Sequence, residues 1–358
     1  MGKPIKGRGS TGRLAGRFEV TTSDPVDDGW HADEAAEFAQ VLPRTVVTEE
    51  TARSIITRNS SPDISFDQSV NPYRGCEHGC SYCFARPSHA YLGLSPGLDF
   101  ETRLFAKTNA PELLRKALAQ RGYVPSPIDL GINTDAYQPI ERRLQLTRRL
   151  IEVLAEARHP FTLITKNALV TRDLDLLQPL ARDNLVRVYF SVTTLDNRLS
   201  AVLEPRASAP HSRLRAIAQL QQAGVPVGVM VAPVIPWVTD HELESILQAV
   251  RDAGAESAGY VLLRLPHEVA PLFRDWLETH LPDRAAHVMS TINQLRGGKD
   301  YDAAFGSRMR GQGVYADLLE RRFKLATRRL GFSPRHEKPL ATHLFKPPRD
   351  PSPQGELF

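Results

Sequence analysis

The stretch "VPVGVMVAPVIPWVTDHELESILQAVRDAG" (residues 225–254) joins a valine-rich apolar run to a segment whose apolar residues recur every three or four positions. The first part has the composition of a parallel β-strand that is covered on both faces. The second has the period of an amphipathic helix, and it ends at Ala-Gly. A strand followed by a helix is the repeating unit of α/β proteins, so this stretch predicts that class.

The same unit recurs along the chain. Apolar strand-like runs lie at 127–133, 161–166, 186–193 and 259–265, and helical patterns follow them at 140–157, 172–183, 212–224 and 269–281. An earlier strand is expected near 64–72. Six strands with right-handed crossovers predict an α/β fold, a partial (β/α)6 TIM-like barrel with N- and C-terminal extensions. In such barrels the chemistry lies in the loops that follow the strands.

The chain divides into four expected regions. Residues 1–40 are rich in Gly, Ser and Asp with few periodic apolar residues, which predicts a disordered N-terminal segment. The barrel is expected over 41–282, a C-terminal extension that packs on it over 283–332, and a flexible tail over 333–358.

Bulk composition favours a cytoplasmic protein. The 358-residue chain is 41% hydrophobic, with no apolar run of the length that spans a bilayer and no secretory signal at its start, so no membrane partner is expected. The chain has three cysteines, which are too few for a disulfide framework, and an odd number cannot all be paired. They favour a metal site or catalysis in a reducing compartment.

Positive charge gathers at the two ends of the chain. Residues 1–17 carry five basic side chains and no acid, and residues 321–349 carry nine against the single acid Glu337, whereas the whole chain sums to only +4. Basic ends can neutralise phosphates, so a nucleic-acid partner is one interpretation. Solvated, flexible tails are the other.

All three cysteines lie in "RGCEHGCSYCFARP" (residues 74–87), directly after the first expected strand. Cys76, Cys80 and Cys83 have the spacing C-x3-C-x2-C, which lets three thiolates converge on one soft metal centre. Zinc needs a fourth ligand, which His78 or His89 can supply. An iron–sulfur cluster normally takes four thiolates, so three leave one iron without a protein ligand.

This loop, with aromatic Tyr82 before its third cysteine, resembles the signature of the radical S-adenosylmethionine superfamily. Six blocks look, in order, like those of its spore photoproduct lyase-like branch, and more narrowly like an uncharacterised bacterial subfamily of that branch, over roughly residues 45–330. The blocks are "NPYRGCEHGCSYCFARP", "NTDAYQPIE", "TLITKN", "FSVTT", "LEPRASAPHSRL" and "APVIPWVTDHELE".

The resemblance implies a 4Fe-4S cluster and S-adenosyl-L-methionine as cofactors. The cluster, reduced by a protein such as flavodoxin or ferredoxin, cleaves S-adenosylmethionine to a 5′-deoxyadenosyl radical, which abstracts hydrogen from a substrate. The branch suggests a nucleic-acid substrate in DNA repair or modification. A radical enzyme that acts on a protein or small metabolite is an alternative, as is a non-catalytic iron–sulfur or zinc nucleic-acid-binding module.

The resemblance also places cofactor contacts on strand ends. Thr134 matches the position that meets the amino group of S-adenosylmethionine, Lys166 the one that meets its carboxylate, and Ser191 a further polar contact. Tyr82 is the expected catalytic residue, beside the adenosyl moiety. Ordinary strand-end polarity is the alternative for Thr134 and Ser191, and a solvated lysine for Lys166.

Four further residues at the same rim are expected to contact the cofactor. Asp135, Gln138 and Glu141 follow the second strand, where the acids can instead cap the next helix. Arg206 follows the fourth strand, and it can instead pair with Glu204.

A late motif, "RMRGQGVY" (308–315), predicts a substrate contact. Arg308 and Arg310 beside two glycines can cradle a phosphate, and Tyr315 can stack on a base. A basic surface turn is the alternative.

The chain departs from spore photoproduct lyase at two positions. That enzyme uses a cysteine outside the cluster as hydrogen-atom donor and a tyrosine on each side of the third cluster cysteine. This chain has no fourth cysteine, and Phe84 follows Cys83 where the second tyrosine is expected. We therefore expect that it does not split the thymine spore lesion by that mechanism.

Overall fold

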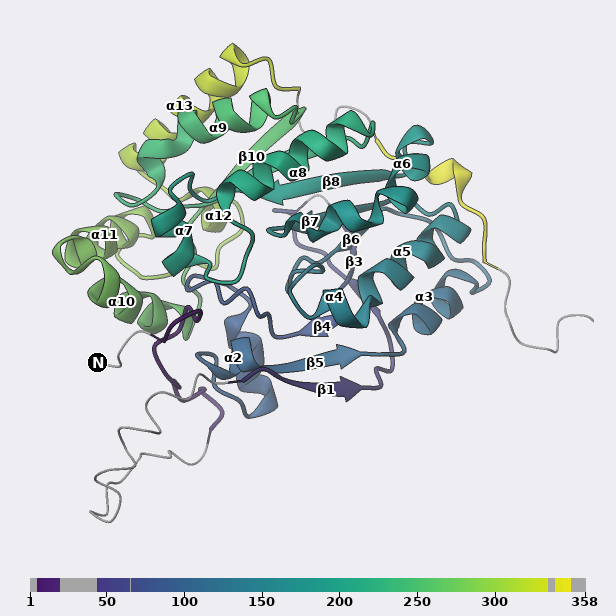
Figure 1. The fold of residues 1–358 in the computed structure, drawn as a ribbon. Helices are drawn as coiled ribbons and strands as arrows, with labels where there is room; N and C mark the ends of the chain where they lie inside the picture. Colours follow the sequence, from purple (N-terminus) through teal and green to yellow (C-terminus); the bar gives the residue numbers. More distant parts are fainter. Residues whose placement is uncertain (1–4, 20–43, 65, 334–338, 349–358) are drawn as a thin grey trace, which may run out of the picture.

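A computed structural model describes residues 5–19, 44–64, 66–333 and 339–348. Its main sheet has seven strands (Figure 1). In spatial order they are β10 (Ser257–Leu262), β9 (Val227–Val234), β8 (Val186–Ser191), β7 (Phe161–Thr165), β6 (Ile128–Leu130), β3 (Gln68–Val70) and β2 (Ile56–Arg58). The six from β3 to β10 pair in parallel, and β2 is antiparallel to β3. The predicted partial barrel of six βα units is confirmed.

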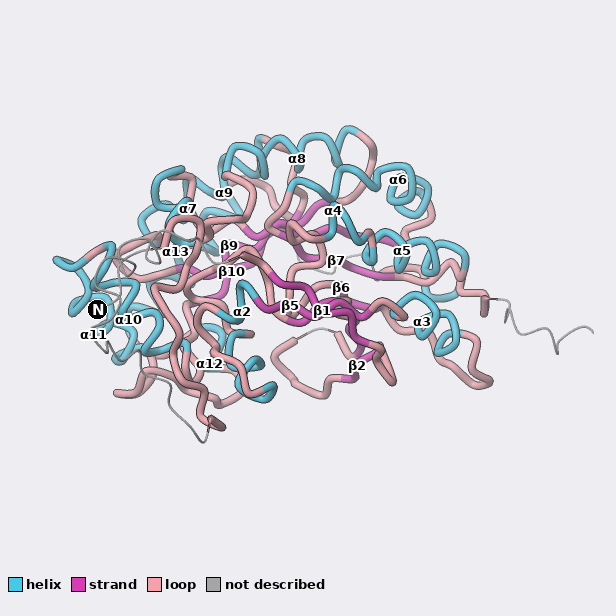
Figure 2. The backbone as a smooth tube through the Cα atoms, turned by 60° about the horizontal axis from the view of Figure 1, so that its bottom comes forward, coloured by secondary structure: helices cyan, strands magenta, loops and turns pink. Residues whose placement is uncertain are grey.

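Helices cover the outer face of this sheet, as Figures 1 and 2 both show. They are α3 (Ala110–Leu118), α5 (Leu146–Glu156), α6 (Leu174–Arg182), α8 (Pro210–Gln222) and α9 (Leu243–Asp252). The helix expected over 140–157 is divided into α4 (Glu141–Leu144) and α5, because Gln145 between them has the left-handed φ of 51°. The residues before α6 form a 3₁₀ turn, η2 (Ala168–Asp173), and another such turn, η3 (Asp240–Glu242), precedes α9.

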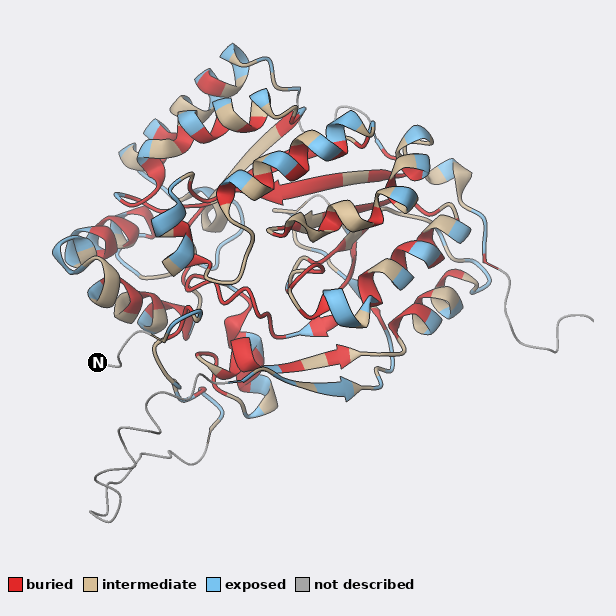
Figure 3. Ribbon diagram, viewed as in Figure 1, coloured by how far each residue is buried: buried red, intermediate tan, exposed pale blue. Residues whose placement is uncertain are grey.

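The main core lies between the strands and these helices. Strand β8 is buried along almost its whole length (Figure 3). Val188 and Phe190 of β8 and Val229 of β9 pack in one cluster with Leu154 of α5 and Leu220 of α8. Burial of each such side chain stabilises the fold by about 1.5–3 kcal/mol. The apolar runs and the helical stripes of the sequence therefore meet as expected.

A second, three-stranded sheet was not predicted. It consists of β1 (Val46–Glu50), β5 (Arg103–Lys107) and β4 (Tyr73–Arg74), in the order β1-β5-β4. Strand β4 pairs antiparallel to β5 and ends two residues before Cys76, so this sheet positions the start of the cysteine loop. The 3₁₀ helix η1 (Arg86–Leu92) and the short helix α2 (Asp99–Thr102) connect that loop to β5.

Four helices follow β10 in the chain: α10 (Val269–His280), α11 (Pro282–Leu295), α12 (Ser307–Arg310) and α13 (Val314–Arg329). Figure 1 shows α10 and α11 side by side and α13 along α9. Arg322 of α13 pairs with Glu244 of α9 at 2.6 Å. No helix among the described residues is long and apolar enough to cross a membrane.

Two segments that were expected to be disordered or flexible are hydrogen-bonded to the rest of the chain where they are described. Residues 5–19 contact the cysteine loop and its neighbours, as detailed below. In residues 339–348, which include the 3₁₀ turn η4 (Thr342–Leu344), Ala341 N donates to Asn184 O at 3.0 Å and Lys346 N to Ala157 O at 2.9 Å. The expectation is thus corrected for these residues. The remaining parts of both segments (1–4, 20–40, 334–338 and 349–358) lie outside the described residues.

A buried histidine links this C-terminal segment to the barrel. The His159 ring accepts a hydrogen bond from the Tyr123 hydroxyl at its Nε2, at 2.9 Å, and lies 5.3 Å from the Phe345 ring. Its Nδ1 lies 2.9 Å from the carbonyl oxygen of Pro160. Burial lowers the pKa of His159 to about 4. The imidazole is therefore neutral in the folded protein at pH 7.

We predict that His159 makes stability fall as pH falls below 6.5. An unfolded histidine titrates near pH 6.5, so between about pH 6.5 and pH 4 the unfolded chain binds a proton that the folded chain does not. The stabilisation is fully present above that window, and about 2 kcal/mol of it is lost by pH 5. Between pH 7 and pH 5, the free energy of unfolding measured with urea should fall less for His159→Gln than for the wild type. Equal drops would contradict this role.

Candidate functional site

The carboxyl ends of the parallel strands bring the predicted site residues to one end of the barrel. The cysteine loop follows β3 and β4, Thr134 follows β6, Lys166 directly follows β7, and Ser191 ends β8. Parallel strands present their carboxyl ends at one edge, which is where TIM-like barrels carry their chemistry. The loops that carry these residues therefore lie together at one open end of the barrel, which we call the barrel mouth.

The three thiols lie close enough to influence one another. Cys76 and Cys80 are buried, with 7% and 8% exposure, and Cys83 is partly buried. Burial raises the pKa of all three thiols, and the charges of Cys80 and Cys83 raise that of Cys76 further. Thiolates so arranged are stabilised when a metal centre replaces their protons.

Of the two histidines that could complete a zinc site, His78 is engaged at both ring nitrogens, whereas His89 is engaged at Nε2 but not at Nδ1. His78 Nδ1 lies 3.3 Å from Asp135 Oδ2, and its Nε2 lies 3.2 Å from Asn167 Nδ2. His89 Nε2 lies 2.9 Å from the carbonyl oxygen of Arg103. Within the described ranges, no three His, Cys, Asp or Glu side chains are arranged to hold a single metal ion. An iron–sulfur cluster attaches its thiolates to separate irons, so these three cysteines fit a cluster better than the Cys3His zinc alternative.

Gln138 braces the loop on both sides of Cys76. Its Nε2 donates to Gly75 O at 3.1 Å, and its Oε1 accepts from Glu77 N at 2.9 Å. The side chain is fully buried. Both ends of the Gln138 amide bind the loop backbone, which favours a positioning role over the expected cofactor contact. Thr134 Oγ1 donates to Tyr73 O at 2.9 Å, which leaves its oxygen able to accept one hydrogen bond more.

Asp135 is a buried carboxylate that ties three loops together. It accepts hydrogen bonds from Thr165 Oγ1 and Lys166 N, both at 2.7 Å, and from Tyr137 N at 2.8 Å. Burial by itself favours the neutral acid, but the charge of His78 and these hydrogen bonds hold the pKa of Asp135 at about 2. Its oxygens accept hydrogen bonds from the protein, which favours a positioning role over the expected cofactor contact.

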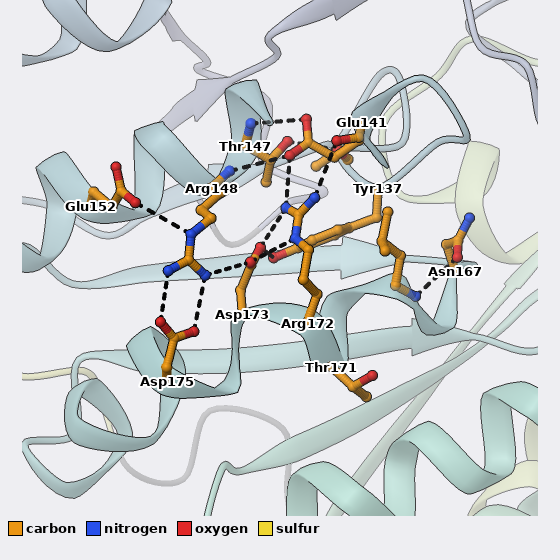
Figure 4. Close-up of polar contacts among 12 residues, drawn as sticks. Tyr137, Glu141, Thr147, Arg148, Glu152, Asn167, Thr171, Arg172, Asp173 and Asp175 are labelled. Carbon is orange, nitrogen blue, oxygen red and sulfur yellow. Dashed lines mark hydrogen bonds and ion pairs between the residues drawn. The ribbon is translucent and has the colours of Figure 1, made fainter. Parts of the chain in front are cut away.

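Glu141 caps the start of α5, as Figure 4 shows. The carboxylate is fully buried, and its oxygens accept hydrogen bonds from four groups: Thr147 N at 3.1 Å, Arg148 N at 3.3 Å, Arg172 Nη2 at 2.9 Å and the Tyr73 hydroxyl. The first two are orphan N–H groups at the start of α5. These contacts favour the capping alternative for Glu141 over the expected cofactor contact.

Tyr82 is held by a buried acid from the loop after β8. Its hydroxyl donates to Glu204, which also accepts from Thr193 Oγ1 at 2.7 Å and pairs with Arg213. Burial opposes ionisation of Glu204, yet the charges of Arg213 and Lys166 hold its pKa at about 2. Burial and the Glu204 charge raise the pKa of Tyr82, so the phenol stays neutral. The Lys166 Nζ lies 5.9 Å from the centre of the Tyr82 ring.

Arg206 pairs with the cysteine loop and not with Glu204. Its Nη1 lies 2.9 Å from Glu77 Oε1, and its backbone N–H donates to His78 O at 3.2 Å. These contacts favour a role in positioning the loop over the cofactor contact expected of Arg206. At the end of β8, Ser191 O accepts from Arg213 Nη1 at 2.9 Å, which leaves the Ser191 hydroxyl out of that contact.

The residues of the late motif do not converge on one phosphate. Arg308 binds Asp63 and Ser61, whereas Arg310 on the same short helix reaches outward to Glu320 at 3.3 Å. The Tyr315 hydroxyl donates to Asp240, beside α9. The three side chains therefore have separate partners, and their expected substrate contact stays a prediction. The first glycine of the motif, Gly311, serves packing, since a Cβ there would lie 3.1 Å from Leu262 and 3.2 Å from Leu295.

Arg86 organises the cysteine loop, and the sequence analysis missed it. The side chain is fully buried and donates to the carbonyl groups of Cys80 at 2.9 Å and Gly79 at 3.2 Å. Further N–H groups reach Pro96 O and Gly97 O, and the charge pairs with Glu101 at 2.5 Å. Only its position three residues after Cys83 hinted at this role, because local pattern does not separate a buried arginine from a surface one.

The N-terminal segment, residues 5–19, covers the back of the same loop. Gly9 N and Ser10 N each donate to the Glu101 carboxylate at 3.0 Å. A Cβ on Gly9 would lie 1.7 Å from Gly79 O, so only glycine permits this approach. Glu101 therefore joins the N-terminal segment, Arg86 and the cysteine loop in one buried contact.

Comparison with known proteins agrees with this geometry. The sequence model of the Radical SAM superfamily matches residues 70–250, which span the cysteine loop and the strands up to β9. The chain therefore belongs to the radical S-adenosylmethionine superfamily. It is a radical S-adenosylmethionine enzyme, whose cofactors are a 4Fe-4S cluster and S-adenosyl-L-methionine, as that family uses.

Particular relatives extend the match. The uncharacterised protein Rv2578c of Mycobacterium tuberculosis is 37% identical over 283 residues, which cover 76% of this chain and 82% of the relative. The uncharacterised protein MJ0683 of Methanocaldococcus jannaschii is 26% identical over 48% of this chain and 62% of its own length. Among solved structures, spore photoproduct lyase complexed with dinucleoside spore photoproduct matches with a TM-score of 0.55 and 18% identity over 80% of each chain. That likeness shows a common fold.

We predict that removing the Arg86 charge destabilises the protein strongly. Arg86→Leu leaves the Glu101 carboxylate buried without its partner, and breaking a buried pair in this way costs about 3–5 kcal/mol. Urea unfolding of the metal-free protein should show this loss. Arg274→Leu is the matched control, because Arg274 pairs with Asp300 at 2.5 Å with 42% and 31% of the two side chains exposed, and such surface pairs contribute about 0–1 kcal/mol. Similar losses for both variants would contradict the role given to Arg86.

Proposed function

We propose that this radical enzyme abstracts hydrogen from a nucleic acid, in repair or modification. The observation that supports this substrate is the fold shared over 80% of each chain with spore photoproduct lyase, which has been solved with a dinucleoside photoproduct. The basic ends of the chain support it less than the sequence suggested. Arg17 pairs with Glu268 at 3.4 Å and Arg322 with Glu244, so both charges are used within the chain.

The bound cluster and S-adenosylmethionine supply a 5′-deoxyadenosyl radical by reductive cleavage, with an electron from a protein such as flavodoxin or ferredoxin. The cluster is held by the three cysteines. Thr134, with an acceptor position left on its hydroxyl, suits an ammonium group, and the cation of Lys166 suits a carboxylate. Ser191 adds a polar contact. Tyr82, whose hydroxyl donates to Glu204, would lie beside the adenosyl group.

The reaction differs from that of spore photoproduct lyase. The chain has three cysteines, all in the cluster loop, so no thiol is left to return a hydrogen atom. Phe84 stands after Cys83, and a phenylalanine has no phenolic O–H to donate. Either the hydrogen atom returns from another donor, or S-adenosylmethionine is consumed in each turnover.

We predict that Lys166→Met weakens S-adenosylmethionine binding while leaving the cluster in place. Loss of a charge-assisted hydrogen bond to the carboxylate costs about 1.5–3 kcal/mol, or roughly a 10- to 150-fold rise in Kd. The anaerobically reconstituted protein is titrated with S-adenosylmethionine by calorimetry, and cluster content is measured by iron and sulfide analysis. Lys116→Met, an exposed lysine of α3, is the control. Equal Kd values for the wild type and Lys166→Met would contradict this assignment.

We predict that the hydrogen abstracted by the enzyme comes from nucleic acid. Reduced, cluster-loaded enzyme is incubated with S-adenosylmethionine and fractions of cells grown in deuterated medium, and the 5′-deoxyadenosine formed is examined by mass spectrometry. Deuterium should enter it from the nucleic-acid fraction. Label from the protein or small-molecule fraction would contradict the proposal and favour the alternative substrate classes. A dinucleoside spore photoproduct should stay unrepaired.

A further inference from the structure

An arginine lies against a phenylalanine at the barrel mouth, next to the third cysteine. Arg264 comes two residues after β10, and its guanidinium carbon is 4.8 Å from the centre of the Phe84 ring. Phe84 directly follows Cys83 and is 40% exposed, which is unusual for so large an apolar side chain. This pair therefore stands at the place where a substrate meets the radical.

Arg264 lies at the barrel mouth, and among the described residues its charge has no ion-pair partner. Burial lowers the pKa of Arg264 and the charge of Arg308 adds to that, whereas Tyr301 and Asp63 act in the opposite direction. Among the described residues, no carboxylate pairs with the Arg264 guanidinium, and no oxygen accepts a hydrogen bond from it. A guanidinium has five N–H donors, and leaving them desolvated without acceptors is costly.

The other buried arginines nearby are saturated. Arg86 and Arg213 each pair with a glutamate. Arg296 donates to the carbonyl groups of Leu263 at 2.7 Å and of Ser307 and Arg308 at 2.8 and 3.0 Å. Among the described residues, these three arginines are therefore matched by acceptors of the protein, whereas Arg264 is not.

A second arginine–phenylalanine pair lies beside the first. The Arg308 guanidinium carbon is 4.7 Å from the centre of the Phe305 ring, and Phe305 is 61% exposed. Because Arg308 is paired with Asp63, it positions the Phe305 ring but contributes little unpaired positive charge. Arg296 donates both to the carbonyl group of Leu263, next to Arg264, and to that of Arg308, so the two pairs lie near each other.

We propose that Arg264, Phe84, Arg308 and Phe305 form a platform for an unpaired nucleotide, with the Arg264 guanidinium on a phosphate and the exposed ring of Phe84 against a base. This inference rests on the proposed function and names the form of its substrate. Sites for single-stranded nucleic acid combine cations along the backbone with aromatic rings under the bases. A duplex hides the faces of its bases, so enzymes that act on a base take it out of the stack.

The experiment measures binding of a fluorescein-labelled oligothymidylate to the cluster-loaded enzyme by anisotropy, under anaerobic conditions and over a series of salt concentrations. Arg264→Gln should raise the Kd about tenfold and reduce the salt slope by about one ion. Phe84→Leu should raise the Kd at least about fivefold, because stacking on one base contributes that much. Arg310→Gln is the matched control, with the same change of charge at an exposed residue of α12, and its Kd should stay within about twofold.

Two further measurements separate the possible failures. Arg264→Lys keeps the charge and should keep the salt slope, and iron content with thermal unfolding shows that each variant is folded and loaded. If the wild type binds no oligonucleotide, the nucleic-acid function itself fails. If it binds and Arg264→Gln matches Arg310→Gln, only the platform is overturned. A shift in the cluster reduction potential of Arg264→Gln with unchanged oligonucleotide binding would also overturn it, since Arg264 would then serve the cluster.

Discussion

The buried pair of Arg86 and Glu101 is the contact on which the rest of the site depends. Arg86 reaches the backbone carbonyl groups of the cysteine loop, and Glu101 accepts the N–H groups of the N-terminal segment. Each charge would be very costly to bury alone, so the pair is stable only when loop, segment and α2 are assembled together. A loop with two glycines at positive φ, Gly75 and Gly79, is in this way held in one shape.

Ionised acids fasten the loops of the barrel mouth to one another. Asp135 joins the loops after β6 and β7 to His78, and Glu204 joins the loop after β8 to Tyr82. Both stay charged in the interior because each is matched by a cation and by several donors. The charged residues nearest the cysteines thus mostly position backbone and aromatic groups. That leaves Lys166 and Arg264 as cations with room for a ligand.

The family chemistry and the individual substrate have separate structural origins. The cluster loop and the strand ends after β6, β7 and β8 carry what the chain shares with other radical S-adenosylmethionine enzymes. Phe84 and Arg264 lie beside these shared positions, at the rim of the barrel mouth. A fold of this kind supports many reactions through changes at such positions, so we expect the rim to select the substrate.

The sequence by itself determined the barrel, its strand order along the chain and the cluster ligands, because hydrophobic period and cysteine spacing are local properties. Only the tertiary structure decided which polar residues are structural. Gln138, Asp135, Glu141 and Arg206 follow strand ends exactly as cofactor contacts do, but their partners lie far along the chain, at Gly75, Thr165, Arg172 and Glu77. The same holds for β1, β4 and β5, short strands that pair across tens of residues. A hydrogen bond between distant segments leaves no periodic trace in either of them, so packing alone reveals it.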